Sequence, residues 1–253
     1  MKKVIITPDN AQTANFREVH MGNIAPGILY RSSHPIKDNK QEKIISMLAN
    51  NARIAAVINL CDTASSVYTK ANFAPWYNAL LKNGLVIALG MDFSVASENF
   101  NRKLKEGLEF VIKTDGPYLI HCYAGVDRTG FVSMVLESFM GAVLDDVIND
   151  YLQSFTSAYE SSIFQANKAD SQIAMQILSV MNGSIAINSE NLQNVAEIYL
   201  KKKIGLFPLE IELLKAKLAG IKIPQLYRRM IDQYHIIKSW KQENTRPDHP
   251  CQN

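Results

Sequence analysis

Residues 121–130 read H-C-Y-A-G-V-D-R-T-G, and they stand between an apolar run at 117–121 and a run typical of a helix at 131–140. A strand is therefore expected before this stretch and a helix after it, which puts Cys122 on a strand-to-helix turn. At such a turn, unpaired backbone N–H groups and the positive end of the helix dipole converge on one point. The turn is therefore a predicted anion site, and its positive field favours the thiolate form of Cys122.

The spacing within this stretch fits a loop that wraps around one tetrahedral phosphate. Five residues separate Cys122 from Arg128, enough for successive N–H groups to point inward while the planar fork of Arg128 binds two phosphate oxygens. Cys122 is then the predicted nucleophile, and the hydroxyl of Thr129 can stabilise the sulfur when water cleaves a phosphocysteine. We expect His121 to fix the loop through a hydrogen bond; the alternative is a core histidine at the end of a strand. The residues expected to bind the substrate are those of the loop: Tyr123, Ala124, Gly125, Val126, Asp127 and Arg128.

The motif resembles the signature of the cysteine-dependent protein-tyrosine and dual-specificity phosphatases, H-C-x-x-G-x-x-R-S/T-G. It is most similar to a bacterial branch of that family, in which the loop reads H-C-x-A-G-K-D-R-T-G with an aspartate directly before the arginine. Other segments that resemble this branch are 29–33, 57–60, 150–154, 199–200, 205–206 and 213–218. The resemblance covers about residues 15–220, and it implies a tyrosine-phosphatase-like fold and catalysis through a phosphocysteine.

One position departs from the branch, because Val126 stands where the branch has lysine. The departure removes a cation from the loop, which disfavours ligands that carry several phosphates. We therefore expect a phosphatase that hydrolyses phosphate monoesters, with phosphotyrosine in proteins as the favoured substrate. The alternatives are a phosphoinositide phosphatase and a phospholigand-binding protein with weak turnover. The expected mechanism needs no metal and no cofactor.

The reaction also needs a general acid that protonates the leaving oxygen, and two aspartates are candidates. Asp127 lies in the loop itself, where the bacterial branch has its proton donor. Asp92 follows the apolar run 85–89, thirty residues before Cys122; in the wider family an aspartate on a mobile loop at about this place is the donor. Each has a structural alternative, since Asp127 can pair with a neighbouring cation and Asp92 can be a turn residue.

Alternation of strand and helix signals predicts an α/β fold with a small, mostly parallel sheet flanked by helices. The predicted strands are 28–31, 54–60, 85–89 and 117–121. The second of these is apolar throughout, as expected of a strand that is buried on both faces. Helices are predicted at 38–50, after a cap at Ser97, at 131–140, and through the chain beyond residue 141.

We expect a single phosphatase domain over residues 1–253. Within it, the α/β catalytic body covers about 15–156, a helical extension covers about 157–240, and a polar tail covers 241–253. The stretch 157–189 is weakly charged and rich in Ala, Ile and Met. In the bacterial branch the equivalent helices form a lid over the catalytic site; the alternative is plain helical core.

The net charge is only +3 and the charges are scattered, which argues against a nucleic-acid partner. The expected partner is a phosphorylated protein or a small phosphomonoester; a membrane lipid is a disfavoured alternative, and the sequence does not determine the oligomeric state.

No apolar run is long enough to span a membrane, and no signal peptide is recognisable. We therefore expect a cytoplasmic protein, with export without a cleaved signal as the alternative.

The three cysteines, Cys61, Cys122 and Cys251, do not make a disulfide scaffold. Cys61 directly follows the predicted strand 54–60, and the carboxyl ends of neighbouring parallel strands border the same crevice. Cys61 is therefore expected near Cys122. There it is either a thiol that traps oxidised Cys122 as a disulfide or, as we favour, a small buried apolar side chain.

Overall fold

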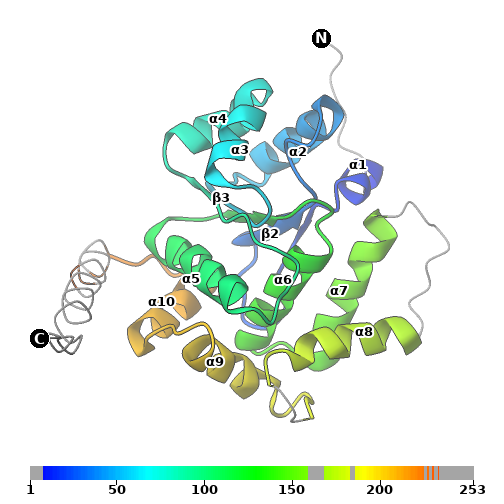
Figure 1. Cartoon of the computed structure of the whole chain (residues 1–253), viewed down its shortest axis with the longest axis vertical. Coiled ribbons are helices and arrows are strands. Elements are labelled where there is room, and N and C mark those ends of the chain that lie inside the picture. The colour runs from blue at the N-terminus through cyan, green and yellow to red at the C-terminus, as the bar shows by residue number, and fades with distance from the viewer. Residues whose placement is uncertain are drawn as a thin grey trace, which may run out of the picture. The chain divides into compact units, whose positions relative to one another are not determined.

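The computed structural model describes residues 8–158, 168–182 and 186–224, together with positions 227, 230 and 233. The chain divides into two compact units, residues 1–221 and 222–253. The first unit holds a five-stranded sheet with helices on both sides (Figure 1). The predicted tail at 241–253 lies outside the described residues.

The sheet has the strand order β1-β2-β5-β3-β4. Four of its five strands are parallel to one another: β2 (Leu29–Ser32), β3 (Ala56–Asn59), β4 (Val86–Ala88) and β5 (Tyr118–His121). A fifth strand, β1 (Arg17–Glu18), pairs antiparallel with β2 and was not predicted, because two residues carry no periodicity. The expected α/β fold with a small, mostly parallel sheet is confirmed, and β3 and β5 are buried along their whole length.

The register of the sheet brings the ends of the parallel strands together. His121 pairs with Ser32 on one side and with Asn59 on the other, and Asn59 pairs with Ala88. The segments that follow these strands therefore all leave the sheet at its carboxyl edge, which is where open α/β sheets place their ligands. The loop from Cys122 to Arg128 follows β5, in the middle of this edge.

On one face of the sheet lie helices from the first third of the chain, which Figure 1 shows above the strands. They are α1 (Pro8–Thr13), α2 (Asn39–Asn51), α3 (Ala64–Lys70), the 3-10 turn η1 (Ala71–Phe73) and α4 (Pro75–Lys82). Helix α2 was predicted, and Asp38 caps it by accepting hydrogen bonds from two backbone N–H groups. Helices α3 and α4 were not predicted, because each is too short to show a clear apolar stripe. Their buried side chains, Val67 and Tyr77 among them, pack with α2 and with Val57 and Leu119 of the sheet.

The other face carries the remaining helices: α5 (Glu98–Lys113), α6 (Asp127–Phe139), α7 (Leu144–Ala158), α8 (Lys168–Ser179), α9 (Leu192–Lys202) and α10 (Pro208–Leu218). Ser97 caps α5 as predicted, accepting a 3.0 Å hydrogen bond from Phe100 N. Helix α6 begins at Asp127 rather than at the predicted Phe131, because the last residues of the loop already have helical backbone. Helix α6 is enclosed by its neighbours, and its residues from Arg128 onward are buried.

The stretch 157–189 is described in part. Its helix α8 packs against α6 and α7, and Ala174 and Leu178 of α8 are buried. Residues 159–167 and 183–185 lie outside the described residues, so the proposal of a lid extends beyond what the structure describes.

Candidate active site

Cys122 leaves the end of β5 and is almost completely buried, with 2% of its surface exposed. The first hydrogen bond of α6 runs from Gly130 N to Val126 O, at 2.7 Å. Within the described chain, the backbone N–H groups of residues 123–129 donate no hydrogen bond. These free N–H groups lie at the positive end of the α6 dipole, beside the cysteine, and together they make an anion cradle.

The carbonyl groups of the loop are held from outside the motif. Tyr123 O accepts from His34 N at 3.0 Å. Gly125 O accepts from Asn15 Nδ2 at 3.1 Å and from Arg31 Nη2 at 2.9 Å. Because a peptide group is planar, each carbonyl that is held outward leaves the N–H on the other side of the same bond facing inward. The cradle therefore depends on donors that lie far from the loop in sequence.

Gly125 is required by its position against β2. Its φ is +75°, and a Cβ at this position would lie 2.5 Å from Ser32 O, well inside van der Waals contact. Only glycine combines this backbone conformation with such a close approach. The glycine of the motif thus has a steric reason in this fold.

Arg128 lies at the start of α6 and is 95% buried, with 5% exposed. Its Nη1 donates to Met91 O at 2.8 Å, and its guanidinium carbon lies 4.3 Å from the centre of the Phe93 ring. Its Nε is buried and has no hydrogen-bond partner in the parts of the chain that the structure describes. A buried guanidinium with an unused N–H is costly unless an anion binds it, so Arg128 is poised to bind one.

The structure brings both candidate acids to the site but gives them different surroundings. Asp127 is the first residue of α6; it is exposed and has no hydrogen-bond or ion-pair partner among the described residues. Asp92 is also exposed, but its Oδ1 accepts from Ser94 N at 3.0 Å and its Oδ2 from Asn99 Nδ2 at 3.3 Å. The carboxylate of Asp92 is thus turned toward its own loop, which Met91 and Phe93 place beside Arg128.

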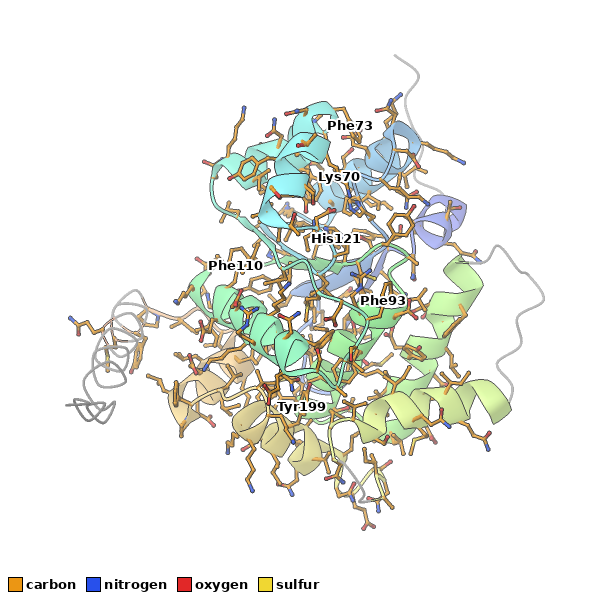
Figure 2. All side chains as sticks on the ribbon, in the orientation of Figure 1. Lys70, Phe73, Phe93, Phe110, His121 and Tyr199 are labelled. Carbon is orange, nitrogen blue, oxygen red and sulfur yellow. The ribbon has the colours of Figure 1, made fainter. Side chains whose placement is uncertain are left out.

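His121 is completely buried, and its ring contacts the backbone of the loop at the carbonyl of Cys122. Burial lowers its pKa well below the ordinary value, so the ring is neutral. Asn59 Nδ2 donates to Tyr77 Oη, which leaves the Tyr77 hydroxyl to donate to His121 Nε2 at 3.1 Å. The proton of the ring is then on Nδ1, which lies 3.3 Å from Cys122 O. Figure 2 shows His121 in the middle of the unit, at the end of the central strand.

Thr129 is completely buried one residue beyond Arg128. Its Oγ1 has no hydrogen-bond partner within residues 8–158, 168–182 and 186–224. The hydroxyl is therefore free to donate a hydrogen bond, as stabilisation of a sulfur leaving group would require.

A second group of polar residues lies beside the loop, and the sequence did not point to it. His34 Nδ1 accepts from Ile36 N at 3.2 Å, so its Nε2 carries the proton that bonds to Asp62 Oδ2 at 2.7 Å. Lys70 Nζ lies 2.5 Å from Asp62 Oδ1. Burial by itself raises the pKa of Asp62, but the bonds from His34, Lys70 and Asn59 outweigh burial and lower it. This carboxylate is ionised and supports His34, whose backbone N–H holds the loop at Tyr123.

In the described chain, side chains of the kinds that bind metal ions come together at His34, Cys61 and Asp62. Their ligand atoms lie within 4.8 Å of one another. Both oxygens of Asp62 are already bound by protein donors, one of them the ammonium group of Lys70. A metal at this place would have to displace that cation, so the donor set does not fit a resident metal.

Cys61 lies close enough to the loop to respond to the charges of Cys122 and Arg128, as expected from the sheet order. Burial, followed by the charges of Asp62 and Cys122, raises the pKa of Cys61 to about 12. The thiol is therefore protonated at neutral pH.

A known sequence family matches most of the chain. A sequence model described as the tyrosine phosphatase family matches residues 9–220, close to the range 15–220 expected from the motif and its flanking segments. No curated protein matches the chain. Two solved structures similar to it are the core catalytic domain of the PP-IP phosphatase Siw14 from S. cerevisiae, in complex with citrate, and a second structure of the Siw14 catalytic core. The first is 19% identical, with a TM-score of 0.41, over 71% of this chain and 96% of that one. The second is 19% identical, with a TM-score of 0.42, over 78% of this chain and 95% of that one.

Among the helices that the structure describes, none could span a membrane.

The family model covers most of the chain, including the loop from Cys122 to Arg128 and every strand of the sheet. The chain therefore belongs to the tyrosine phosphatase family, and it is a phosphoric monoester hydrolase.

Proposed function

We propose that the protein hydrolyses phosphate monoesters through a phosphocysteine on Cys122, and that phosphotyrosine in proteins is its favoured substrate. The observation that carries the proposal is the set of free N–H groups at 123–129 around a buried cysteine, closed by an arginine whose Nε has no partner among the described residues. Such a cradle is built for a tetrahedral dianion.

In the first step, the Cys122 thiolate attacks phosphorus and forms a P–S bond as the ester P–O bond breaks. The leaving oxygen takes a proton from the general acid. In the second step, the same carboxylate accepts a proton from water as the water oxygen attacks phosphorus. The P–S bond then breaks, Thr129 donates a hydrogen bond to the departing sulfur, and orthophosphate leaves. The N–H groups and Arg128 bind the three non-bridging oxygens of the phosphoryl group throughout. These donors stabilise the negative charge that the oxygens carry in the transition state.

We assign the general acid to Asp127. Its carboxyl is unengaged and lies at the loop, whereas both oxygens of Asp92 accept hydrogen bonds within their own segment.

Phosphotyrosine is favoured over multiply phosphorylated lipids for two reasons. Val126 supplies no loop cation, and its side chain is buried. Two exposed aromatic rings, those of Tyr123 and Phe93, flank the loop and offer apolar surface to the ring of a phosphotyrosine. We further propose membership of the bacterial branch with the H-C-x-A-G-K-D-R-T-G loop, and a reducing cytoplasm as the location, since the nucleophile must stay a free thiol.

The test is release of phosphate from p-nitrophenyl phosphate and from a phosphotyrosine peptide, in the presence of a metal chelator. We expect the wild type and a Cys61→Ser control to hydrolyse both, and Cys122→Ser to lose activity by at least about 10³-fold. Equal activity of Cys122→Ser and wild type would remove the proposed mechanism. Retention of the phosphopeptide without hydrolysis by the wild type would instead support the phospholigand-binding alternative.

A further inference from the structure

We propose that Arg31 and Asp150 are positioning residues that hold the Gly125 peptide in the orientation that the anion cradle needs. The inference rests on the proposed function, because this cradle is the phosphate site of the proposed reaction. Both residues lie outside the motif: Arg31 is in β2 and Asp150 is in α7.

The contact that carries the inference is made by Nη2 of Arg31. It lies 2.9 Å from Gly125 O, and it pulls this carbonyl toward β2 and away from the centre of the loop. The peptide that joins Gly125 to Val126 is planar, so the Val126 N–H must face the opposite way, toward the anion. A full positive charge on the carbonyl side also polarises the peptide and strengthens its N–H as a donor.

Arg31 is completely buried, with 0% exposed, and one carboxylate keeps it charged and in place. Its Nη1 lies 2.5 Å from Asp150 Oδ2, and its Nη2 also bonds to Ser154 Oγ at 2.8 Å. Burial raises the pKa of Asp150, but the charges and hydrogen bonds of Arg31 and Arg17 outweigh burial and lower it. The pair is therefore ionic inside the protein.

A second arginine, Arg17, positions Asn15, which donates hydrogen bonds to the carbonyl groups of Gly125 and Ala124. Arg17 Nε lies 2.7 Å from Asp150 Oδ1, and Arg17 Nη1 donates to Asn15 Oδ1 at 2.5 Å. This bond fixes which end of the Asn15 amide faces the loop: its Nδ2 lies 3.1 Å from Gly125 O and 3.4 Å from Ala124 O. Asp150 thus orients both donors that hold the Gly125 carbonyl.

Stability alone does not account for this arrangement. An apolar pair of similar volume generally stabilises a core as well as a buried ion pair does, since the ion pair loses hydration. What an apolar pair cannot do is donate to the Gly125 carbonyl. The distinctive consequence of the pair is therefore the orientation of the loop.

The test compares anion affinity with stability in matched variants. Arg31→Lys keeps the charge but lacks the fork that reaches Asp150 and Gly125 together, and Asp150→Asn keeps the shape but not the charge. We expect both to weaken binding of tungstate, measured by calorimetry, by roughly tenfold to a hundredfold, with a similar fall in kcat/KM on p-nitrophenyl phosphate. Urea unfolding gives the stability of each variant, so that all measurements are made on folded protein.

Lys217→Met is the control for burial of a cation. Lys217 is also buried, and its Nζ donates to Thr114 O at 2.5 Å and to Asp115 Oδ1 at 2.7 Å. These partners lie before the start of β5, whereas Cys122 follows its end. We expect this variant to lose stability and to keep wild-type tungstate affinity and kcat.

The proposal is overturned if Arg31→Lys keeps tungstate affinity and kcat within about twofold of wild type while it loses as much stability as Lys217→Met. If the wild type binds tungstate but hydrolyses nothing, the proposed function fails and the comparison of affinities still decides the positioning role. If neither Arg31→Lys nor Asp150→Asn folds, Asn15→Gly decides with the same readouts, because the φ of +48° at Asn15 suits glycine.

Discussion

Arg128 Nη1 lies 2.8 Å from the carbonyl oxygen of Met91, which ties the start of α6 to the segment after β4. The guanidinium is therefore oriented before a phosphate binds, with one edge on a backbone carbonyl and one face against the Phe93 ring at 4.3 Å. Its Nε stays unused among the described contacts. A preoriented arginine loses less conformational entropy when the anion binds, which raises affinity.

Loss of the Phe93 ring should weaken this preorganisation by a small, measurable amount. Phe93 is 67% exposed, and a cation–π contact at an exposed site contributes about 0.5–1 kcal/mol, so we expect Phe93→Ala to lower kcat/KM about 2- to 5-fold. Phe73, which is 41% exposed, lies well apart from Phe93 in Figure 2, and Phe73→Ala is the control without effect. An unchanged Phe93→Ala would show that the ring does not help to orient Arg128.

The general acid is identified by the response to the leaving group. Asp127→Asn and Asp92→Asn are to be assayed on an aryl phosphate, whose phenolate leaves easily, and on an alkyl phosphate, whose alkoxide needs a proton. We expect Asp127→Asn to lose about 10²–10⁴-fold in kcat on the alkyl ester and far less on the aryl ester. We expect Asp92→Asn to change both by a similar small factor. The reverse pattern would transfer the role to Asp92.

Gly125→Ala should inactivate the enzyme because two independent costs fall on one residue. The added Cβ would meet Ser32 O at 2.5 Å, and the φ of +75° is unfavourable for alanine. Gly84→Ala separates the two costs, since Gly84 has a φ of +70° and no atom within 4 Å of the added Cβ. We expect Gly84→Ala to lose about 1–2 kcal/mol of unfolding free energy and no activity, and Gly125→Ala to lose both. Full activity of Gly125→Ala would contradict the close packing of the loop on β2.

Glu137 should make the protein less stable as the pH rises. This residue of α6 is completely buried, and neither of its carboxyl oxygens has a hydrogen-bond partner in the described chain. Burial, followed by the charge of Asp150, raises the pKa of Glu137 well above its ordinary value. The folded protein therefore holds a proton that the unfolded chain releases above about pH 4.3. The resulting stabilisation is complete below that pH and declines as the pH rises through the folded-state pKa.

Glu137→Gln replaces the protonated carboxyl by a neutral group of the same shape. We expect the melting temperature of this variant to match that of wild type near pH 4.5 and to exceed it by several degrees at pH 8, at about 2–4 °C for each kcal/mol. Glu212→Gln, at an exposed carboxylate in α10, is the control and should show no such trend. A lower melting temperature of Glu137→Gln at pH 8 would mean that Glu137 is ionised and paired.

Cys61 should resist alkylation and oxidation although it neighbours the nucleophile. With its pKa raised to about 12, roughly one molecule in 10⁴ carries the thiolate at pH 8. We expect iodoacetamide to label Cys61 only after unfolding in urea, and peroxide to produce no disulfide between Cys61 and Cys122. Peptide mass spectrometry under non-reducing conditions measures both. Rapid labelling of Cys61 in the folded protein, or a disulfide in high yield, would restore the alternative in which Cys61 traps oxidised Cys122.

Several features of this fold could be predicted from the sequence because their signals are local. The spacing of Cys122 and Arg128, the apolar run before them and the helix after them predict a strand, an anion-binding turn and a helix in that order. The Ser97 cap and the apolar strand 54–60 are equally local, and the α/β fold with a parallel sheet follows from their alternation. These signals are readable because helix periodicity, capping and strand burial act over a few residues.

The contacts that hold the loop from outside the motif are visible only in the folded chain. Arg31 and Gly125 are 94 residues apart in the chain, and Arg17 and Asp150 are 133 apart, so no periodicity links them. From the sequence, a charged residue such as Arg31 or Asp150 is expected to be exposed. In the folded chain β2 and α7 bury both side chains. The proposed assignment of the general acid likewise rests on tertiary contacts, because both oxygens of Asp92 accept hydrogen bonds and those of Asp127 accept none within the described chain. Such pairings arise from packing between distant segments, where each partner decides the environment of the other, and only the folded chain contains that information.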